Sequence, residues 1–284
     1  MAIMNYETPN ITKIDFEDSI FVTTECGFEN KEIENFIVSQ GGIIKGSVTK
    51  STNYLIYGDG KEETAKYRKA LDLIQEKGLA ITMLPMSLFL IACRGKGLVE
   101  FGTYPFDADG TPKPIKWVIL NQDGERSLLF SAFELECKPY HSKKFADITW
   151  DRCSLRKWLN EDFYSAAFSA AEQQKILTTR VRTENHPQYG TFGGNEIDDK
   201  VFLLSIEEIA CNTTEFTRRI KPTPFVMTQI PNSWAGYDWW WLRSPGYCSG
   251  SASSVDPFGR VSLYGDRELD TIRAVCPALW VELE

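Results

Sequence analysis

The chain has 284 residues, of which 43% are hydrophobic and 25% are charged, and its formal net charge is −8. This length predicts about two domains, and the composition is typical of folded globular chains rather than disordered or membrane-embedded ones. Residues 1–92 hold 9 basic and 13 acidic residues, and the remainder holds 22 and 26. Neither half therefore has the basic excess of a module that binds duplex nucleic acid.

The sequence predicts neither export nor membrane insertion. No apolar run reaches the ~20 residues that a membrane-spanning helix needs. The first ten residues lack the basic and apolar regions of a signal peptide. The seven cysteines are odd in number and widely spaced, which favours reduced thiols over a disulfide framework. We expect a cytoplasmic protein with no membrane partner, or a virion-associated one if the gene belongs to a phage.

All eight tryptophans lie after residue 116, which indicates that two unlike domains are joined. The first domain, residues 1–93, alternates β and α segments. Short β-branched and aromatic runs predict strands at 19–24, 43–44, 53–57 and 79–82. Apolar residues at helical spacing predict helices at 29–40, 62–77 and 85–93. The order β-α-β-β-α-β-α predicts an α/β fold, with a small parallel four-stranded sheet and flanking helices.

Several motifs occur together in this domain: the Thr23-Thr24 pair that ends the first strand, the Gly41-Gly42 pair, and segments 48–56 and 66–73. In combination they resemble a BRCT domain, with its core at 17–93. Phe89 lies in the last helix where this family often has tryptophan, and in this respect the sequence resembles the bacterial DNA-ligase branch. The resemblance implies an α/β docking module.

BRCT domains often bind phosphate through a Ser or Thr after the first strand and a Lys that opens the second helix. The matching residues are Thr23 or Thr24, and Lys66. A hydroxyl and an ammonium at a helix N-terminus suit a phosphoryl dianion. The resemblance therefore implies a phosphorylated partner. The alternative is a docking or dimerising module in which these are ordinary turn and helix residues.

The second domain, residues 98–284, shows mixed elements. A hairpin is predicted from strands 115–120 and 127–130 around Asp123-Gly124. Helices are predicted over 154–163, after the capping box Ser169–Glu172, and from Ser205. Further strands are predicted at 200–204, 239–242, 260–263 and 278–281. This pattern predicts an α+β fold with many loops.

Five segments of the second domain carry a further resemblance: 101–105, 153–163, 200–206, 239–246 and 277–280. They resemble C-type-lectin-like domains of the formylglycine-generating-enzyme type, in a bacterial and phage branch. That branch includes the variable proteins of diversity-generating retroelements. The resemblance implies a C-type lectin fold that displays a hypervariable ligand-binding segment at 247–272.

Codon chemistry supports this hypothesis. Such retroelements randomise adenines, chiefly in AAC or AAT codons, and the resulting codons cannot encode Lys, Glu, Gln, Met or Trp. These five types make up 61 of the 284 residues, yet residues 242–267 contain none of them. A turn-rich segment of small residues would show the same absence.

Within the segment, Val255, Gly259, Val261 and Gly265 are spaced like scaffold positions, and polar and aromatic residues lie between them. Such residues on rigid turns are typical of adaptable binding surfaces. The predicted ligand-binding residues are Tyr247, Cys248, Ser251, Ser254, Asp256, Phe258, Arg260, Ser262, Tyr264, Asp266 and Arg267. The alternative is an ordinary surface hairpin.

We do not expect catalysis. Formylglycine-generating enzymes need a Cys-x4-Cys pair, and no two cysteines here have that spacing. The only histidines, His141 and His186, belong to no zinc motif. We predict no catalytic residue, no metal ligand and no cofactor. Trp239–Trp241 is expected to be a strand whose alternate rings lie in the core, rather than a sugar-stacking surface.

The sequence thus predicts a non-enzymatic binding protein of two domains. Its C-terminal face would bind a protein or another macromolecule, and its BRCT-like domain would bind a phosphorylated partner. Two alternatives stay open. One is a formylglycine-generating-type enzyme with displaced chemistry. The other is an accessory protein that acts on nucleic acid or phosphoproteins through the BRCT-like domain.

Overall fold

The computed structural model describes residues 14–27, 30–143, 147–229, 238–266 and 272–283. It divides into two compact units, Met1–Cys93 and Arg94–Glu284, which are described separately. Arg267, one of the predicted ligand-binding residues, lies outside the described residues. Within the described ranges, no helix combines the length and the apolar character that a membrane crossing requires.

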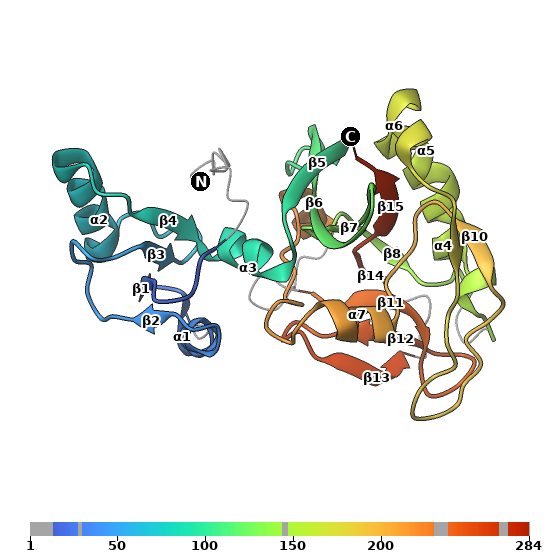
Figure 1. Ribbon diagram of the computed structural model, residues 1–284. Helices are drawn as coiled ribbons and strands as arrows, with labels where there is room; N and C mark the ends of the chain where they lie inside the picture. The colour runs from blue at the N-terminus through green and yellow to red at the C-terminus, as the bar shows by residue number, and fades with distance from the viewer. Residues whose placement is uncertain (1–13, 28–29, 144–146, 230–237, 267–271, 284) are drawn as a thin grey trace. The chain divides into compact units, whose positions relative to one another are not determined.

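The first unit is built on a parallel four-stranded sheet in the order β2-β1-β3-β4 (Figure 1). The strands are β1 (Ile20–Thr24), β2 (Ile43–Ile44), β3 (Tyr54–Tyr57) and β4 (Thr82–Pro85). The helices are α1 (Asn30–Ser39), α2 (Ala65–Lys77) and α3 (Met86–Arg94). The predicted element order and the small parallel sheet are confirmed.

The fourth strand begins at Thr82, three residues later than predicted. Gly78 ends α2 in a left-handed conformation, with φ 61°, and its N–H donates to the Ile74 carbonyl. The Leu79 N–H then donates back to the Leu73 carbonyl, so this residue still belongs to the helix end. Pairing with the sheet starts only where the Thr82 N–H reaches the Asn53 carbonyl at 2.8 Å.

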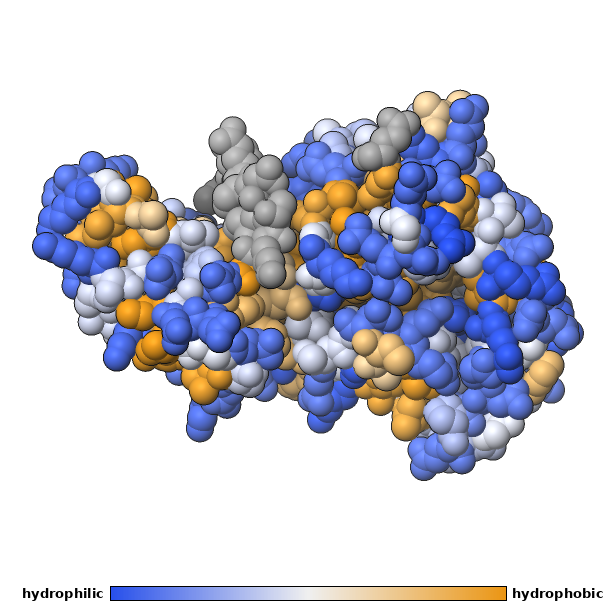
Figure 2. Space-filling model, viewed as in Figure 1, coloured by the Kyte–Doolittle hydropathy of each residue, from blue (hydrophilic) through white to orange (hydrophobic). Residues whose placement is uncertain are grey.

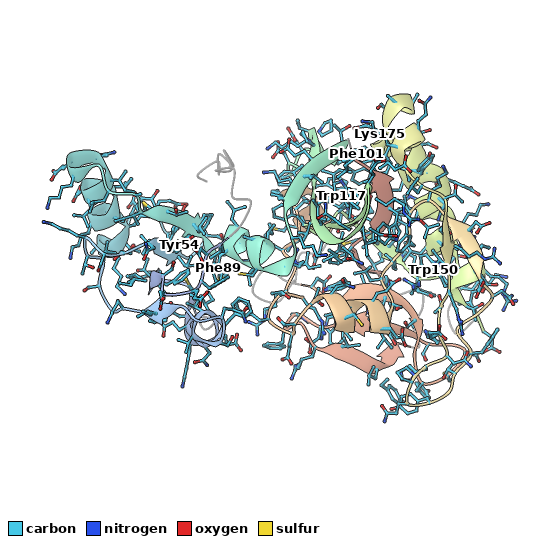
Figure 3. The ribbon with its side chains drawn as sticks, in the orientation of Figure 1. Tyr54, Phe89, Phe101, Trp117, Trp150 and Lys175 are labelled. Carbon is cyan, nitrogen blue, oxygen red and sulfur yellow. The ribbon has the colours of Figure 1, made fainter. Side chains whose placement is uncertain are left out.

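Aromatic packing on the sheet fills the core of the first unit. Phe21 stacks on Tyr54 of the neighbouring strand, with ring centroids 4.6 Å apart. Phe89 of α3 is fully buried and meets Phe16 and Phe36 edge-on; Tyr54 and Phe89 are labelled in Figure 3. A phenyl ring thus occupies the α3 core position where the resembling family often has tryptophan.

The regular structure of the second unit is mostly β-sheet, in two larger sheets and a small one (Figure 1). One sheet has the order β15-β7-β6-β5, from β5 (Leu98–Pro105), β6 (Pro112–Asp123), β7 (Arg126–Ser131) and β15 (Ala278–Glu282). The other has the order β13-β12-β11-β14-β8, from β8 (Glu136–Pro139), β11 (Trp240–Pro245), β12 (Ala252–Val255), β13 (Val261–Asp266) and β14 (Ile272–Val275). The small sheet pairs β9 (Thr179–Val181) with β10 (Ile197–Asp199).

The helices of the second unit are short. They are η2 (Trp150–Arg152), α4 (Ser154–Trp158), η3 (Leu159–Phe163), α5 (Tyr164–Ala167), α6 (Ala170–Lys175), α7 (Ile206–Asn212) and α8 (Pro224–Gln229). The predicted helix over 154–163 is present as α4 continued by the π-helical turn η3. The Ser169–Glu172 capping box is confirmed, and a second one joins Ser205 to Glu208.

Tryptophans form much of the core of the second unit. Trp117, Trp150, Trp240 and Trp241 are all at most 1% exposed. The Trp117 indole donates to the Phe101 carbonyl at 2.7 Å, and both residues lie within the curved sheet in Figure 3. The predicted core strand is confirmed at Trp240 and Trp241, but the prediction that only alternate rings are buried is wrong. Two successive rings are buried because β11 is central in its sheet and both of its faces are covered.

Residues 200–204 are not a strand, so that prediction is wrong. Their apolar side chains are buried, but within this run only Phe202 makes a β-bridge, to Ala278. The Asn160 side-chain oxygen instead accepts the backbone N–H groups of Lys200 and Val201. The strand at this point of the chain is β10, which ends at Asp199.

The Glu134 carboxyl of the second unit is completely buried, and this gives a prediction on pH. Burial, and then the charge of Asp238, raise the pKa of Glu134 well above its usual value, and the Asp238 backbone N–H and Arg94 offset part of this. The folded state therefore holds a proton that the unfolded chain releases at lower pH. The stability that this proton contributes is present at low pH. It is lost as the pH rises toward the pKa of Glu134 in the folded state.

Glu134→Gln removes this dependence. Each unit of pKa shift corresponds to about 1.4 kcal/mol. We therefore compare the unfolding free energy of the variant with that of the wild type at pH 5 and at pH 8. We expect this difference to shift in favour of the variant by at least about 1 kcal/mol between pH 5 and pH 8. Urea unfolding followed by tryptophan fluorescence measures this, because every tryptophan lies after residue 116. Glu125→Gln, at an exposed turn, is the control. An equal effect of Glu134→Gln at both pH values would contradict the prediction.

Candidate functional site

A pocket of 540 Å³ opens where β1 ends in the first unit. Its lining residues come from the end of β1, the start of α1, the turn after β3 and the start of α2. They are Thr23, Thr24, Glu25, Cys26, Gly27, Asn30, Lys61 and Lys66. We call it the β1 pocket. It brings together all three residues predicted to bind phosphate, which lie up to 43 positions apart in the sequence.

Lys66 reaches the pocket from the first turn of α2. Thr64 is the N-cap of that helix, and its hydroxyl accepts the Tyr67 N–H. This cap fixes Lys66 close to the helix N-terminus. The Lys66 ammonium donates to the Thr23 backbone carbonyl at 2.9 Å. A cation is therefore held at the end of β1, and an ammonium has further donors to offer a ligand.

The two threonines of the pocket differ. The Thr23 hydroxyl donates to a Glu34 carboxylate oxygen at 2.6 Å, and the Asn30 amide donates to the same oxygen at 2.9 Å. The Thr24 hydroxyl makes no hydrogen bond with any residue in the described part of the chain. The structure thus separates the two candidates: Thr23 is engaged by Glu34, and Thr24 has a hydroxyl free for a ligand.

Sequence reasoning missed Lys61 and Glu25. Lys61 lies in the turn that follows β3, and β3 ends at Tyr57 directly beside Thr24 of β1. Neighbouring parallel strands end at the same edge of a sheet, so this turn could have been assigned to the pocket. Neither the Lys61 ammonium nor the Glu25 carboxylate has a hydrogen bond or ion pair with a described residue. The pocket lining therefore carries two cations and one anion.

Glu25 has a left-handed backbone, with φ 54°. The neighbouring Gly58 packs so closely that a Cβ there would lie 2.1 Å from the Glu25 carbonyl oxygen. Left-handed conformations cost a non-glycine residue about 1 kcal/mol. Glu25 keeps a charged side chain at a position that glycine would occupy without strain.

The second unit displays an exposed aromatic surface. Tyr247 and Tyr264 stack with ring centroids 4.0 Å apart, and Tyr189 lies edge-on at 6.3 Å and 6.5 Å from them. Tyr189 and Tyr264 are 43% and 57% exposed. We call these three residues the tyrosine cluster. On the visible face of each unit, hydrophilic residues are interspersed with hydrophobic patches (Figure 2).

Tyr189 comes from a loop far from the predicted ligand-binding segment, so sequence reasoning missed it. The buried His186 ring holds the loop, because its Nδ1 accepts the backbone N–H groups of Gln188 and Tyr189 at 3.1 Å each. Burial lowers the pKa of His186, which favours the neutral ring that this acceptor role requires. No short-range pattern links this loop to the β12–β13 hairpin.

Three predicted ligand-binding residues are buried, and their assignment to an exposed face is wrong. Ser251, Ser254 and Asp256 are 2%, 1% and 7% exposed. β12 is an interior strand, so alternation does not bring Ser254 to solvent. The Ser251 hydroxyl donates to the Cys248 carbonyl. The Asp256 carboxylate accepts the Phe258 and Arg260 backbone N–H groups and so shapes the hairpin turn.

Other predicted residues are occupied by contacts within the unit. Arg260 forms an ion pair with Asp256, and Asp266 with Arg273. The Phe258 carbonyl accepts from the Arg219 guanidinium at 3.1 Å. Cys248 and Ser262 are half-buried. Among the described members of the predicted face, Tyr264 and Arg260 are exposed, and Tyr247 is half-buried against Tyr264.

The structure pairs none of the seven described cysteines in a disulfide. Burial raises the pKa of Cys153 to about 12, and it raises the pKa of Cys276 well above its usual value. A buried thiol with a raised pKa is a poor nucleophile. The described residues contain no group of three His, Cys, Asp or Glu side chains placed to hold a metal ion.

Comparison with known proteins identifies the domain family of the first unit. Residues 13–74 match the family model of the BRCA1 C Terminus (BRCT) domain. A DNA ligase from Acanthamoeba polyphaga mimivirus is 45% identical over 58 residues. The matched stretch is 20% of this chain and 9% of the ligase, so the similarity covers less than a tenth of that protein's length. The N-terminal unit is thus a BRCT domain with a DNA-ligase-like sequence.

The second unit defines the family of the whole chain. Residues 116–283 match the family model described as Domain of unknown function (DUF6273). Because this match spans more than half of the sequence, the chain belongs to the DUF6273 family. No solved structure matches the chain.

Proposed function

We propose that this protein is a non-enzymatic docking protein whose BRCT domain binds a phosphorylated partner. BRCT domains commonly bind phosphorylated partners or DNA. One observation carries the proposal: a free Thr24 hydroxyl and the Lys61 and Lys66 ammonium groups line a single pocket. A phosphoryl dianion accepts several hydrogen bonds and is favoured by two nearby cations. The buried, weakly acidic thiols of the second unit support a role without nucleophilic catalysis.

The test measures fluorescence anisotropy of the full chain with two degenerate peptide pools. One pool has phosphothreonine at its centre, and the other has threonine. We expect saturable binding of the phosphorylated pool alone. Equal binding of both pools, or no binding of either, would overturn the proposal.

The two threonines give a matched pair of variants. Thr24→Val removes the free hydroxyl, and a hydrogen bond to a charged group contributes about 1.5–3 kcal/mol. We therefore expect it to weaken phosphopeptide binding roughly 10-fold or more. Thr23→Val removes only the bond to Glu34, and we expect lower thermal stability with binding changed less than about 3-fold. A larger loss of binding in Thr23→Val than in Thr24→Val would contradict this assignment.

We further propose that the second unit has a C-type-lectin-like fold that presents a ligand-binding face, as in variable proteins of diversity-generating retroelements. The tyrosine cluster favours this, because rigidly held tyrosines at a protein surface supply contact area at low entropic cost. Diversification requires a reverse-transcriptase gene nearby and a near-repeat of the 3′ end of this gene that differs at adenines. A genome with neither removes diversification from the proposal.

A further inference from the structure

The β1 pocket contains a carboxylate, which is unfavourable for a ligand that carries only negative charge. Glu25 lines the pocket beside Thr24, its side chain is exposed, and no described residue neutralises it. Lys61 and Lys66 can together balance one phosphoryl dianion. The Glu25 charge then remains unbalanced unless the ligand itself supplies a cation.

We propose that Glu25 makes the pocket selective for a phosphorylated peptide that has a lysine or arginine beside the phosphorylated residue. This inference rests on the proposed phosphate-binding function. A zwitterionic ligand of this kind satisfies all three charges: its phosphoryl group meets Lys61 and Lys66, and its basic side chain meets Glu25. Opposite charges near a protein surface attract, and the like-charge arrangement repels by a similar amount.

The same charges disfavour a nucleic acid. A DNA strand carries one phosphate per 3.4 Å, so a terminal 5′-phosphate in the pocket brings further negative charges toward Glu25. Residues 1–92 offer no compensating basic excess, with 9 basic against 13 acidic residues. Because binding to nucleic acid depends largely on neutralised phosphates, we infer that the phosphopeptide is the preferred ligand of the two.

The backbone at Glu25 is the second observation. Its φ of 54° is a conformation that favours glycine, and its carbonyl lies closely packed against Gly58. An acidic side chain kept at such a strained position beside a binding pocket points to a role for the carboxylate. It places the charge at the end of β1, next to the free Thr24 hydroxyl.

The experiment compares four ligands on the full chain at fixed salt. Three are phosphothreonine peptides of one sequence, flanked on both sides by Lys, Ala or Glu, and the fourth is a 5′-phosphorylated single-stranded DNA of 15 nucleotides. For the wild type we expect the Lys-flanked peptide to bind about 3- to 10-fold more tightly than the Ala-flanked one. The Glu-flanked peptide and the DNA should bind more weakly than both.

Two substitutions assign the selectivity to Glu25. Glu25→Gln is expected to abolish the difference between Lys and Ala flanks while phosphate-dependent binding persists, and Glu25→Lys is expected to reverse the preference and improve DNA binding. Glu76→Gln, at an exposed position of α2, is the matched control and should keep the wild-type pattern.

The outcomes separate the two proposals. If no peptide binds in a phosphate-dependent manner, the proposed function itself fails. If the phosphopeptides bind but the flanking residues make no difference, or Glu25→Gln leaves the difference intact, only the selectivity fails. Tighter binding of the DNA than of any peptide overturns the selectivity and supports a nucleic-acid ligand.

Discussion

Lys66→Ala is expected to weaken phosphopeptide binding by the full chain at least 10-fold. Lys66 is held at the end of β1 by its bond to the Thr23 carbonyl and lies in the first turn of α2. A charge-assisted hydrogen bond to a phosphoryl oxygen is worth about 1.5–3 kcal/mol, which corresponds to roughly 10- to 100-fold in affinity. Titration of a phosphothreonine peptide, followed by anisotropy, measures the loss.

Lys69→Ala is the control for this variant, because Lys69 is an exposed lysine of the same helix outside the pocket lining. It should leave the affinity within about 2-fold of the wild type, as expected for a screened surface charge. The loss of the bond to Thr23 also lowers stability, so circular dichroism at the assay temperature must show a folded Lys66→Ala protein. Equal affinities of the folded Lys66→Ala and Lys69→Ala proteins would contradict the role assigned to Lys66.

Gly259→Ala is expected to destabilise the second unit by about 3 kcal/mol or more. Gly259 lies at the tip of the β12–β13 hairpin with φ 85°, and an added Cβ would lie 1.9 Å from the Glu215 carbonyl oxygen. The clash is with a backbone carbonyl, which cannot rotate away as a flexible side chain can. The hairpin tip must therefore move away from the segment that contains Glu215 and Arg219. The bond from Arg219 to the Phe258 carbonyl would then be lost. Overpacking and positive φ together justify the size of the effect.

Gly110→Ala separates these two causes. Gly110 has nearly the same φ, 82°, but an added Cβ meets nothing within 4 Å. We expect a loss of about 1 kcal/mol there, from backbone strain alone. Urea unfolding followed by tryptophan fluorescence reports on the second unit, since the first 116 residues contain no tryptophan. Similar losses in both variants would show that the hairpin tip is not packed as described.

The fold of the first unit could be predicted well because the sequence patterns that specify it are local. The helical spacing of Ile33 and Ile37 and the short β-branched strands specify both elements and order. The end of α2 was harder, because Leu79 looks like strand sequence yet completes the helix through a bond to Leu73. In the pocket, Thr24 and Lys66 follow from motif resemblance. The role of Lys61 could not be predicted without knowing which strands are neighbours in the sheet. The amino-acid sequence also does not indicate that the Glu25 backbone is left-handed.

The second unit shows where periodicity is insufficient. Alternation along a strand predicts one exposed face, but β11 and β12 are interior strands with both faces covered, so Trp240, Trp241 and Ser254 are all buried. The apolar run 200–204 looks like a strand, but the Asn160 side chain takes two of its N–H groups. Tyr189 joins the tyrosine cluster through a contact between distant segments, which no single sequence reveals.

The most direct test of the central claim is an amide NMR titration of the full chain with O-phosphothreonine, with threonine as the control. We expect saturable chemical-shift changes at Thr24, Lys61 and Lys66 with O-phosphothreonine. Threonine should cause none, and Lys66→Ala should remove them. Shifts of equal size with both compounds, shifts confined to the second unit, or no shifts at millimolar ligand would contradict a phosphate-binding site in the β1 pocket.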